Sequence, residues 1–188
     1  MILSICICSL DDRLPMLAIL LRHLQAQIDK YPGQAEVVVE TDNRKITTGE
    51  KRNILYARAR GKYVCSIDDD DWVSNDYVSE IMEALKTEPD AIAMHGTMTT
   101  NSGNPLTWFI SAYNPYAEVK KNGRTHYLRF TNHLSPVKKE IAIQFPFPHQ
   151  NHEEDYIFAK AMHDSHLIKT EVIIHKNIYE YRYRTKKN

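Results

Sequence analysis

The sequence predicts a single α/β domain in which an open, mostly parallel sheet is flanked by helices. The first half of the chain alternates short apolar runs with segments whose apolar residues recur every three or four positions, which is the pattern of strand–helix units. A length of 188 residues leaves room for one domain. With 43% hydrophobic and 26% charged residues, the composition is that of a folded globular protein rather than of a disordered chain.

The first 67 residues are expected to form strands over 2–9, 36–40 and 62–67, with helices over 12–28 and about 50–60. The first strand is a short isoleucine-rich run, which is typical of a strand buried on both faces. The first helix carries a stripe of leucines at helical spacing, and Pro15 falls in its first turn, where proline is tolerated. Pro32-Gly33 and Gly61 separate these elements.

The second half of the chain predicts helices between Ser74 and Pro89, over 137–143 and over 153–163, and strands over 91–98, 167–175 and 178–184. Ser74 is the residue type preferred at a helix N-cap, and Pro89 would follow the end of that helix. Between residues 99 and 133, glycine and proline interrupt short aromatic runs, which favours irregular strands and loops.

Charge and cysteine content narrow the class of protein. The 24 Lys and Arg balance the 24 Asp and Glu. This balance argues against a protein that binds nucleic acid or an anionic membrane mainly through a broad basic surface. No stretch approaches the roughly 18 apolar residues of a membrane span, and the N-terminal run lacks the basic leader of a signal peptide. Three cysteines fit no disulfide framework, so we expect reduced thiols in a cytoplasmic protein.

Acidic residues follow each of the first three predicted strands. The segments are Ser9-Leu10-Asp11-Asp12-Arg13, Thr41-Asp42-Asn43 and Asp68-Asp69-Asp70-Asp71. In an open parallel sheet the ligand site lies at the carboxyl ends of the strands, so these acids are expected to hold a metal, a ribose or a base with donor groups. The glycine-rich phosphate loops of dinucleotide-binding and P-loop proteins are absent from the sequence.

The run Asp68–Asp71 supports two interpretations equally well. Alternate aspartates of an extended segment point the same way, so one pair could bind a hard divalent cation through oxygen. The run could equally be a solvated turn and helix N-terminus, where acids favour the dipole. A calcium loop of the EF-hand type is excluded because Ser74 stands where that loop needs glycine.

Three ordered motifs carry a resemblance that spans most of the chain. They are Gly49-Glu50-Lys51-Arg52-Asn53 with Ala59-Arg60-Gly61-Lys62-Tyr63-Val64, then Ile67-Asp68-Asp69-Asp70-Asp71-Trp72, then Glu153-Glu154-Asp155-Tyr156 followed by Tyr179-Glu180-Tyr181-Arg182-Tyr183-Arg184. In this order the motifs resemble the family 2 glycosyltransferases of the GT-A fold, a Rossmann-like α/β fold. The resemblance implies an inverting transfer of a sugar from a nucleoside diphosphate sugar, here expected to be a UDP-sugar, with Mn²⁺ or Mg²⁺ as cofactor.

The resemblance also implies roles for individual residues. Asp70 would bind the metal, joined by the late histidine His175, and Asp155 would be the catalytic base, with Glu154 and Glu153 as neighbouring candidates. The nucleotide sugar would be bound by Ser9, Arg13, Asp42, Lys51, Arg52, Asp68 and Asp69. Residues 1–98 would form the nucleotide-sugar-binding half of the domain, and residues 99–188 the half with the acceptor site and the base.

The acceptor and some alternatives stay open at this point. A glycan, a protein or a modified base in DNA could serve as acceptor, and Arg182 or Arg184 could screen a diphosphate. His133 could line the acceptor side, and Trp72 or the aromatic set Trp108, Phe109, Tyr113 and Tyr116 could stack on a sugar or simply pack in a core. A nucleotide-sugar-binding module without transfer activity, or a divalent-metal phosphohydrolase, would use the same acids.

Overall fold

The structure, a computed structural model, describes residues 1–183, apart from the side chain of Lys121. Arg184, which the sequence assigns to the closing strand and to the screening of a diphosphate, lies outside the described residues. The N-terminal elements follow the predicted alternation. They are β1 (Leu3–Leu10), α1 (Leu14–Ile28), β2 (Ala35–Asp42), α2 (Thr48–Arg58) and β3 (Tyr63–Ser66).

The later elements complete a ten-stranded sheet. They are β4 (Trp72–Val73), α3 (Tyr77–Ala84), β5 (Ala91–Thr100), β6 (Leu106–Ile110), β7 (Ala117–Lys121), β8 (Arg124–Arg129), β9 (Val137–Lys138), α4 (Lys139–Ala142), α5 (Glu154–Ser165) and β10 (Glu171–Tyr183), with short 3-10 turns at Asp11–Arg13 and Leu85–Thr87. The main strand order is β2-β1-β3-β9-β5-β6-β8-β7, and β10 pairs with both β4 and β5.

The sheet is mixed, and most of its paired residues lie in parallel pairs. β1 runs parallel to β2 and to β3, β5 runs parallel to β10, and β6 runs parallel to β8. The shorter contacts of β4, β7 and β9, together with the β5–β6 pair, are antiparallel. The predicted fold class, a mostly parallel α/β sheet flanked by helices, is confirmed.

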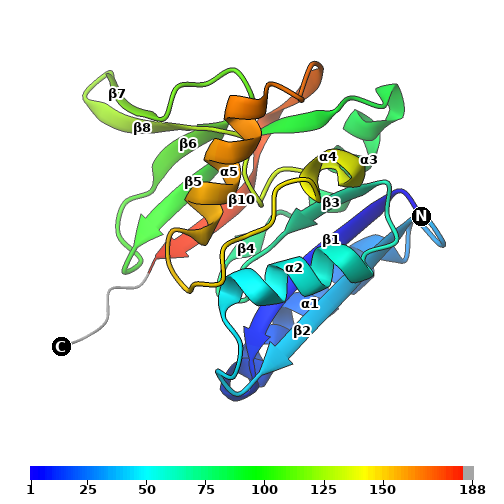
Figure 1. The fold of residues 1–188 in the computed structure, drawn as a ribbon. Coiled ribbons are helices and arrows are strands. Elements are labelled where there is room, and N and C mark those ends of the chain that lie inside the picture. The colour runs from blue at the N-terminus through cyan, green and yellow to red at the C-terminus, as the bar shows by residue number, and fades with distance from the viewer. Residues whose placement is uncertain (184–188) are drawn as a thin grey trace.

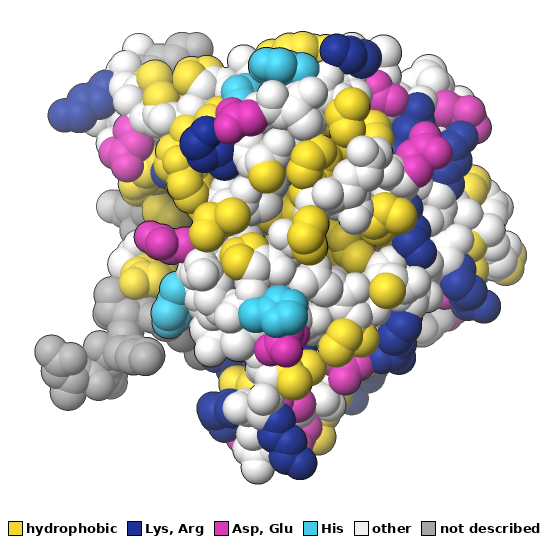
Figure 2. All heavy atoms as spheres, viewed as in Figure 1, with side chains coloured by type: hydrophobic (Ala, Val, Ile, Leu, Met, Phe, Trp, Pro, Cys, Tyr) yellow, Lys and Arg dark blue, Asp and Glu magenta, His cyan; other side chains and the backbone are white. Residues whose placement is uncertain are grey.

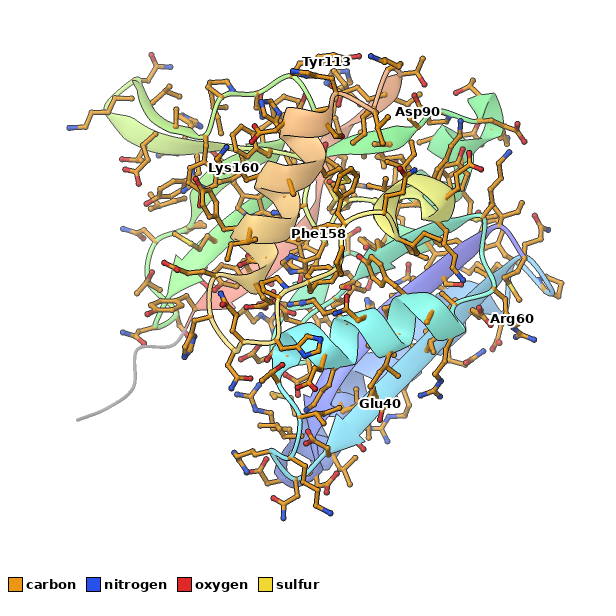
Figure 3. The ribbon with its side chains drawn as sticks, viewed as in Figure 1. Glu40, Arg60, Asp90, Tyr113, Phe158 and Lys160 are labelled. Atoms are coloured by element: carbon orange, nitrogen blue, oxygen red, sulfur yellow. The ribbon has the colours of Figure 1, made fainter. Side chains whose placement is uncertain are left out.

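Helices cover both faces of this sheet, which gives three layers. Alternate residues of β1 face opposite sides, so Ile5 packs in a core with α1 and α3, whereas Cys6 packs in a second core with α2, α4 and α5. Figure 1 shows α2, α4 and α5 on the near face of the sheet and α1 behind it. In Figure 3, Phe158 projects from α5 toward α2, where it stacks on Phe147 at 4.1 Å between ring centroids.

Several element boundaries differ from the sequence prediction. Residues 99–133 hold three strands, in which β7 and β8 form a hairpin, because the aromatic runs pair with β5 and with one another. The two predicted closing strands are one strand, β10, which is bulged between Ile174 and Tyr179. α3 begins after Asp76, and the Ser74 hydroxyl donates to the Asp76 carboxylate instead of capping the helix.

Gly96 in β5 allows an unusually close approach by the neighbouring strand. A Cβ at this position would lie 2.1 Å from the Trp108 ring, so the indole rests directly against the glycine backbone. The indole Nε1 donates to the carbonyl of Thr97 at 3.0 Å, which fixes the ring in place. Glycine is therefore required at residue 96 by packing and not by a turn.

Candidate active site

The four aspartates of the acidic run have four different surroundings. Asp69 is buried and fully paired, since it accepts from the Ser9 hydroxyl at 2.6 Å and from Arg13 at 2.7 Å. Asp71 is also buried, and it accepts from the Tyr179 hydroxyl and from the backbone N–H of Arg182, both at 2.7 Å. These two carboxylates therefore hold the loop against its neighbours and are not free for a ligand.

Asp68 and Asp70 are the members of the run that face outward. Asp68 accepts from Arg52 Nη2 at 2.9 Å and lies 3.7 Å from His133 Nε2. No described side chain donates a hydrogen bond to Asp70, whose nearest cation is Arg13 at 3.5 Å, and its side chain is 33% exposed. Asp70 is thus the aspartate of the run best placed to accept an added cation.

The electrostatics of the run follow from this division. Burial alone raises the pKa of Asp68, but the Arg52 guanidinium and His133 outweigh it and hold that pKa well below its usual range. Burial, together with the neighbouring Asp68 charge, raises the pKa of both Asp70 and Asp71. The ionised form of Asp70 is therefore disfavoured by burial and by the Asp68 charge, and a divalent cation bound there would favour it.

Asp42 and Lys51 form an internal ion pair at the ends of β1 and β2. The buried Lys51 pairs with Asp42 and donates to the Ser9 carbonyl at 2.6 Å. Burial would raise the pKa of Asp42, but Lys51 and the N–H groups of Lys45 and Ile46 lower it to about 2. The structure brings these predicted site residues together, and it uses them to join β1, β2 and α2.

Arg52 connects the acidic run to the predicted base helix. Its side chain is only 3% exposed, and its Nε lies 3.5 Å from the buried Glu154 carboxylate at the start of α5. The guanidinium also lies 5.8 Å from the centroid of the Phe147 ring. Because Asp68 pairs with Nη2 of the same guanidinium, Arg52 fixes the acidic run relative to α5.

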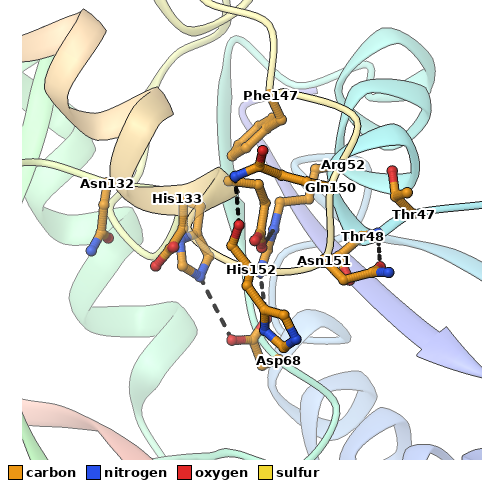
Figure 4. Close-up of polar contacts among 12 residues, drawn as sticks. Thr47, Thr48, Arg52, Asp68, Asn132, His133, Phe147, Gln150, Asn151 and His152 are labelled. Carbon is orange, nitrogen blue, oxygen red and sulfur yellow. Dashed lines mark hydrogen bonds and ion pairs between the residues drawn. The ribbon is translucent and has the colours of Figure 1, made fainter.

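Segment 147–151 is docked on the N-terminal half of α2, where a Thr47–Glu50 capping box begins the helix. The Asn53 amide and the Phe147 backbone exchange two hydrogen bonds of 2.8 and 2.9 Å. Asn151 accepts from the Thr48 N–H at 2.9 Å, as Figure 4 shows. The segment leads directly into α5, so α2 determines where that helix starts.

The three acids at the start of α5 separate into distinct environments. Glu153 precedes the helix in the left-handed region, with φ of 62°, and is exposed. Glu154 points inward to Arg52. Asp155 is 43% exposed, and its carboxylate lies 4.0 Å from His133 Nδ1. Of the three, Asp155 combines an accessible carboxylate with a fixed neighbour.

His133 lies at the centre of the site (Figure 4). Its imidazole is buried between Asp68 and Asp155, and neither ring nitrogen has a hydrogen-bond partner among the described residues. Buried polar atoms are normally paired, so this ring is placed to meet a ligand or to hold the two carboxylates. From the sequence, His133 is only a candidate for the acceptor side. The segment before it has no regular pattern of apolar residues that would place the histidine in the fold.

A cavity of about 810 Å³ opens between the acidic run, the start of α5 and the strands β5, β6 and β8. Its lining includes the polar residues Arg52, Asp68, His133, Glu153, Glu154 and Asp155, together with Met98, Trp108, Ile110, Tyr116, Tyr127, Arg129, Phe130 and Tyr156. The polar residues of three sequence motifs thus share one cavity with an aromatic wall. Figure 2 shows that hydrophobic side chains also gather on the outer surface over α4 and α5.

The aromatic candidates divide between this cavity and other places. Trp108 and Tyr116 line it, whereas Phe109 stacks on His95 and Tyr113 is 65% exposed on a loop. Trp72 stacks on His23 at 4.5 Å between centroids. The sequence does not single out Tyr127 and Arg129 as site residues. The signal that could have found them is their two-residue spacing, which places both side chains on one face of a strand.

His175 is not brought together with the other predicted site residues. It is exposed on β10, where its ring lies 6.3 Å from that of His95. Tyr179, which contacts the acidic run, follows four residues later, beyond the bulge of β10. Across residues 1–183, the described part of the chain, no three His, Cys, Asp or Glu side chains gather as ligands for a metal ion.

Comparison with known proteins is decisive for the family. The family model described as "Glycosyl transferase family 2" matches residues 5–147, which contain the sheet core and the acidic run. The chain belongs to glycosyl transferase family 2. The match ends before α5, so it leaves Glu154 and Asp155 outside the region that the family model covers. A search of curated protein sequences gives no match.

Solved structures of a Staphylococcus aureus protein, TarS, share the GT-A fold of this chain. TarS residues 1–349 in complex with UDP superpose with a TM-score of 0.70 at 16% identity, covering 97% of this chain and 60% of that one. The complex with UDP-GlcNAc also gives 0.70, at 15% identity, and covers 100% of this chain and 60% of that one. This chain therefore spans about three-fifths of the length of these TarS structures.

A separate observation concerns membranes. Among the described residues, no helix combines the length and the apolar character that a membrane crossing requires.

Proposed function

We propose that this member of glycosyl transferase family 2 transfers a sugar from a nucleoside diphosphate sugar to an acceptor hydroxyl, with inversion at the anomeric carbon. The observation that carries the proposal is the shared cavity, which the accessible Asp155 carboxylate lines together with Asp68 and Arg52. We take UDP as the nucleotide, because two similar structures were determined with UDP and with UDP-GlcNAc. The transferred sugar is a hexose or a pentose.

In the proposed reaction Asp155 is the base. The acceptor oxygen forms a bond to the anomeric carbon while the bond from that carbon to the diphosphate oxygen breaks. The hydroxyl proton passes to the Asp155 carboxylate, and the diphosphate leaves with the electron pair. Asp155 suits this role better than Glu154, which is buried against Arg52, or Glu153, which lies outside the helix.

The donor is proposed to lie along the carboxyl ends of β1 and β3. Asp68 and the partly exposed Arg13 are accessible there, whereas Ser9, Asp42, Lys51, Arg52 and Asp69 shape the site through their contacts with one another and with Asp68. Inverting transfer needs the base and the leaving group on opposite sides of the sugar. A donor at the strand ends and a base on α5 meet that requirement.

A divalent cation, Mn²⁺ or Mg²⁺, is proposed to bind at Asp70. The fit rests on the partly exposed Asp70 carboxylate, which has only Arg13 nearby, and on the neighbouring Asp68 carboxylate. When bound, such a cation stabilises the negative charge of a leaving diphosphate as a Lewis acid. Asp68 would lie next to it, held in place by Arg52.

The function is tested with Asp155→Asn. We expect hydrolysis of the effective UDP-sugar, found by thermal-shift screening with Mn²⁺, to fall by about 10²-fold or more, because the water that replaces the acceptor loses its base. UDP affinity by calorimetry should stay within about twofold, since the base does not hold the nucleotide. Asp164→Asn, on the exposed end of the same helix, is the matched control.

Three results would contradict the proposal. Unchanged turnover in Asp155→Asn would remove the base assignment. Release of inorganic phosphate or of nucleoside monophosphate instead of UDP would indicate a phosphohydrolase, and binding of UDP-sugars without any turnover would indicate a binding module.

A further inference from the structure

Arg129 lies in the wall of the cavity and is held in a fixed orientation. Its guanidinium lies between two tyrosine rings, 4.3 Å from the centroid of Tyr116 and 4.8 Å from that of Tyr127. Its Nη1 donates to the carbonyls of Ala117 and Leu128, both at 3.0 Å. These contacts leave Nε and Nη2, the adjacent donors on one edge of the guanidinium, without an acceptor among the described residues.

Arg129 also has no carboxylate partner within the described part of the chain. The other arginine in the cavity, Arg52, pairs with Asp68 and Glu154, and Arg13 at the strand ends pairs with Asp69. A partly buried cation without a counterion is unfavourable, and the two tyrosine faces compensate only part of that cost. The free edge of the guanidinium has the geometry that binds a phosphate or a carboxylate through two hydrogen bonds.

The surroundings of Arg129 suit a hydroxyl-bearing molecule. Tyr116 packs edge-on against Tyr156 of α5 at 4.9 Å, so the aromatic wall continues from Arg129 to the residue next to Asp155. The Asn132 amide lines the same cavity, and its Nδ2 has no acceptor among the described residues. The cavity thus offers an anion-binding group, neutral donors and aromatic faces beyond the carboxylates.

We propose that Arg129 binds a phosphate or carboxylate group of the acceptor, so that the acceptor of this enzyme is an anionic hydroxyl compound. This inference deepens the proposed function. It rests on that function because only a transferase has an acceptor. The binding site itself is defined by the position of Arg129 in the wall of the cavity that Asp68 and Arg52 also line. A donor diphosphate is the other oxyanion that could reach the cavity, and the experiment separates the two.

The experiment measures binding of three probes, glucose 6-phosphate, glucuronate and glucose, by calorimetry, with and without saturating UDP and Mn²⁺. We expect at least one of the two anionic sugars to bind measurably more tightly than glucose, also when UDP fills the donor site. Arg129→Met should weaken that binding by about tenfold or more and leave UDP affinity unchanged. Methionine keeps a similar apolar side chain between the two tyrosines and removes the charge.

Arg124→Met is the matched control, since Arg124 is an exposed arginine on the same strand, outside the cavity. Thermal unfolding of both variants verifies that they fold. Equal binding of the anionic sugars by the two variants, or no preference for the anions over glucose, would overturn the proposal. Weakened UDP binding in Arg129→Met with anionic sugars unaffected would reassign Arg129 to the donor. If UDP does not bind, that result contradicts only the proposed function. The titrations without UDP then still test whether Arg129 binds the anionic sugars.

Discussion

Four identical side chains in a row have four different surroundings in this protein. The partners of Asp68, Asp69 and Asp71 come from different parts of the chain, while Asp70 has only Arg13 nearby. Asp69 meets Ser9 and Arg13 from the end of β1, whereas Asp71 meets Tyr179 from β10. The sequence spacing shows that the mutual repulsion of four adjacent carboxylates is unfavourable unless cations or hydrogen-bond donors compensate it. It contains no information about which distant donors do so. The sequence therefore predicts where the site lies, and it leaves open which aspartates are free.

At the scale of single residues, Asp70→Ala tests the proposed cation site. In the unchanged protein, Mn²⁺ should raise UDP affinity, and in the variant UDP should bind equally with and without Mn²⁺. We expect a loss of about tenfold or more in the presence of the metal, equivalent to about 1.4 kcal/mol. Calorimetry at fixed ionic strength makes the comparison.

Asp12→Ala is the control for this measurement, since Asp12 is an exposed acid in the turn after β1 and its ion pair in the described structure is with Arg44. A Mn²⁺ effect of full size in Asp70→Ala would place the cation on another carboxylate.

At the scale of elements, α2 acts as the support for the segment that precedes the base helix. The Gly49 N–H donates to the Gln150 carbonyl at 3.1 Å, and a Cβ on Gly49 would lie 1.9 Å from the Pro148 carbonyl oxygen. Gly49→Ala should therefore displace segment 147–151 and with it the start of α5. We expect a loss of about 1–3 kcal/mol in the free energy of unfolding and lower donor hydrolysis.

Urea unfolding and the hydrolysis assay check this expectation together. Gly103→Ala is the control, because a Cβ there would meet a single close neighbour, the Thr100 carbonyl, at 3.0 Å in an exposed turn. If Gly49→Ala unfolds and turns over like the control, the support role of α2 is wrong.

Elements whose apolar residues recur with one clear period could be predicted from the sequence. Strands that are defined only by their pairing with other strands could not. The leucine stripe of α1 predicts a helix and the isoleucines of β1 predict a strand, since each element packs a full face in a core. The strands β6, β7 and β8 carry aromatic and basic residues on partly exposed faces, so no alternation marks them. β10 looked like two strands because its exposed bulge near Lys176 interrupts the apolar pattern.

At the scale of the whole molecule, Asp90 joins the start of β5 to elements far along the chain. Its carboxylate accepts from Lys138 of β9 at 2.8 Å and from the N–H groups of Lys169 and Thr170, which lead into β10. Figure 3 shows Asp90 near the top of the sheet. Burial would raise its pKa, but Lys138 and these N–H groups lower it to about 2.

This shift predicts an acid-sensitive contribution to stability. A carboxyl whose pKa is lower in the folded state stabilises the fold above its unfolded pKa, near 4, and the contribution is lost as the pH falls toward 2. Asp90→Asn should lower the free energy of unfolding by about 1–2 kcal/mol at pH 7 and by clearly less at pH 2.5, where part of the contribution is already lost. Urea titrations at both pH values measure the difference.

Glu118→Gln, an exposed acid on β7 without an ion pair among the described residues, is the comparison variant. A destabilisation by Asp90→Asn that is as large at pH 2.5 as at pH 7 would show that the neutral hydrogen bonds, and not the charge, matter.

The close contact between Gly96 and Trp108 has a consequence for the range of molecules that this enzyme accepts. Because the indole lines the cavity and rests on a residue without a side chain, the position of this part of the cavity wall depends on Gly96. A side chain at residue 96 would displace the ring. The shape of the cavity, and so the size of the acceptor proposed to bind there, depends on the absence of a single methyl group.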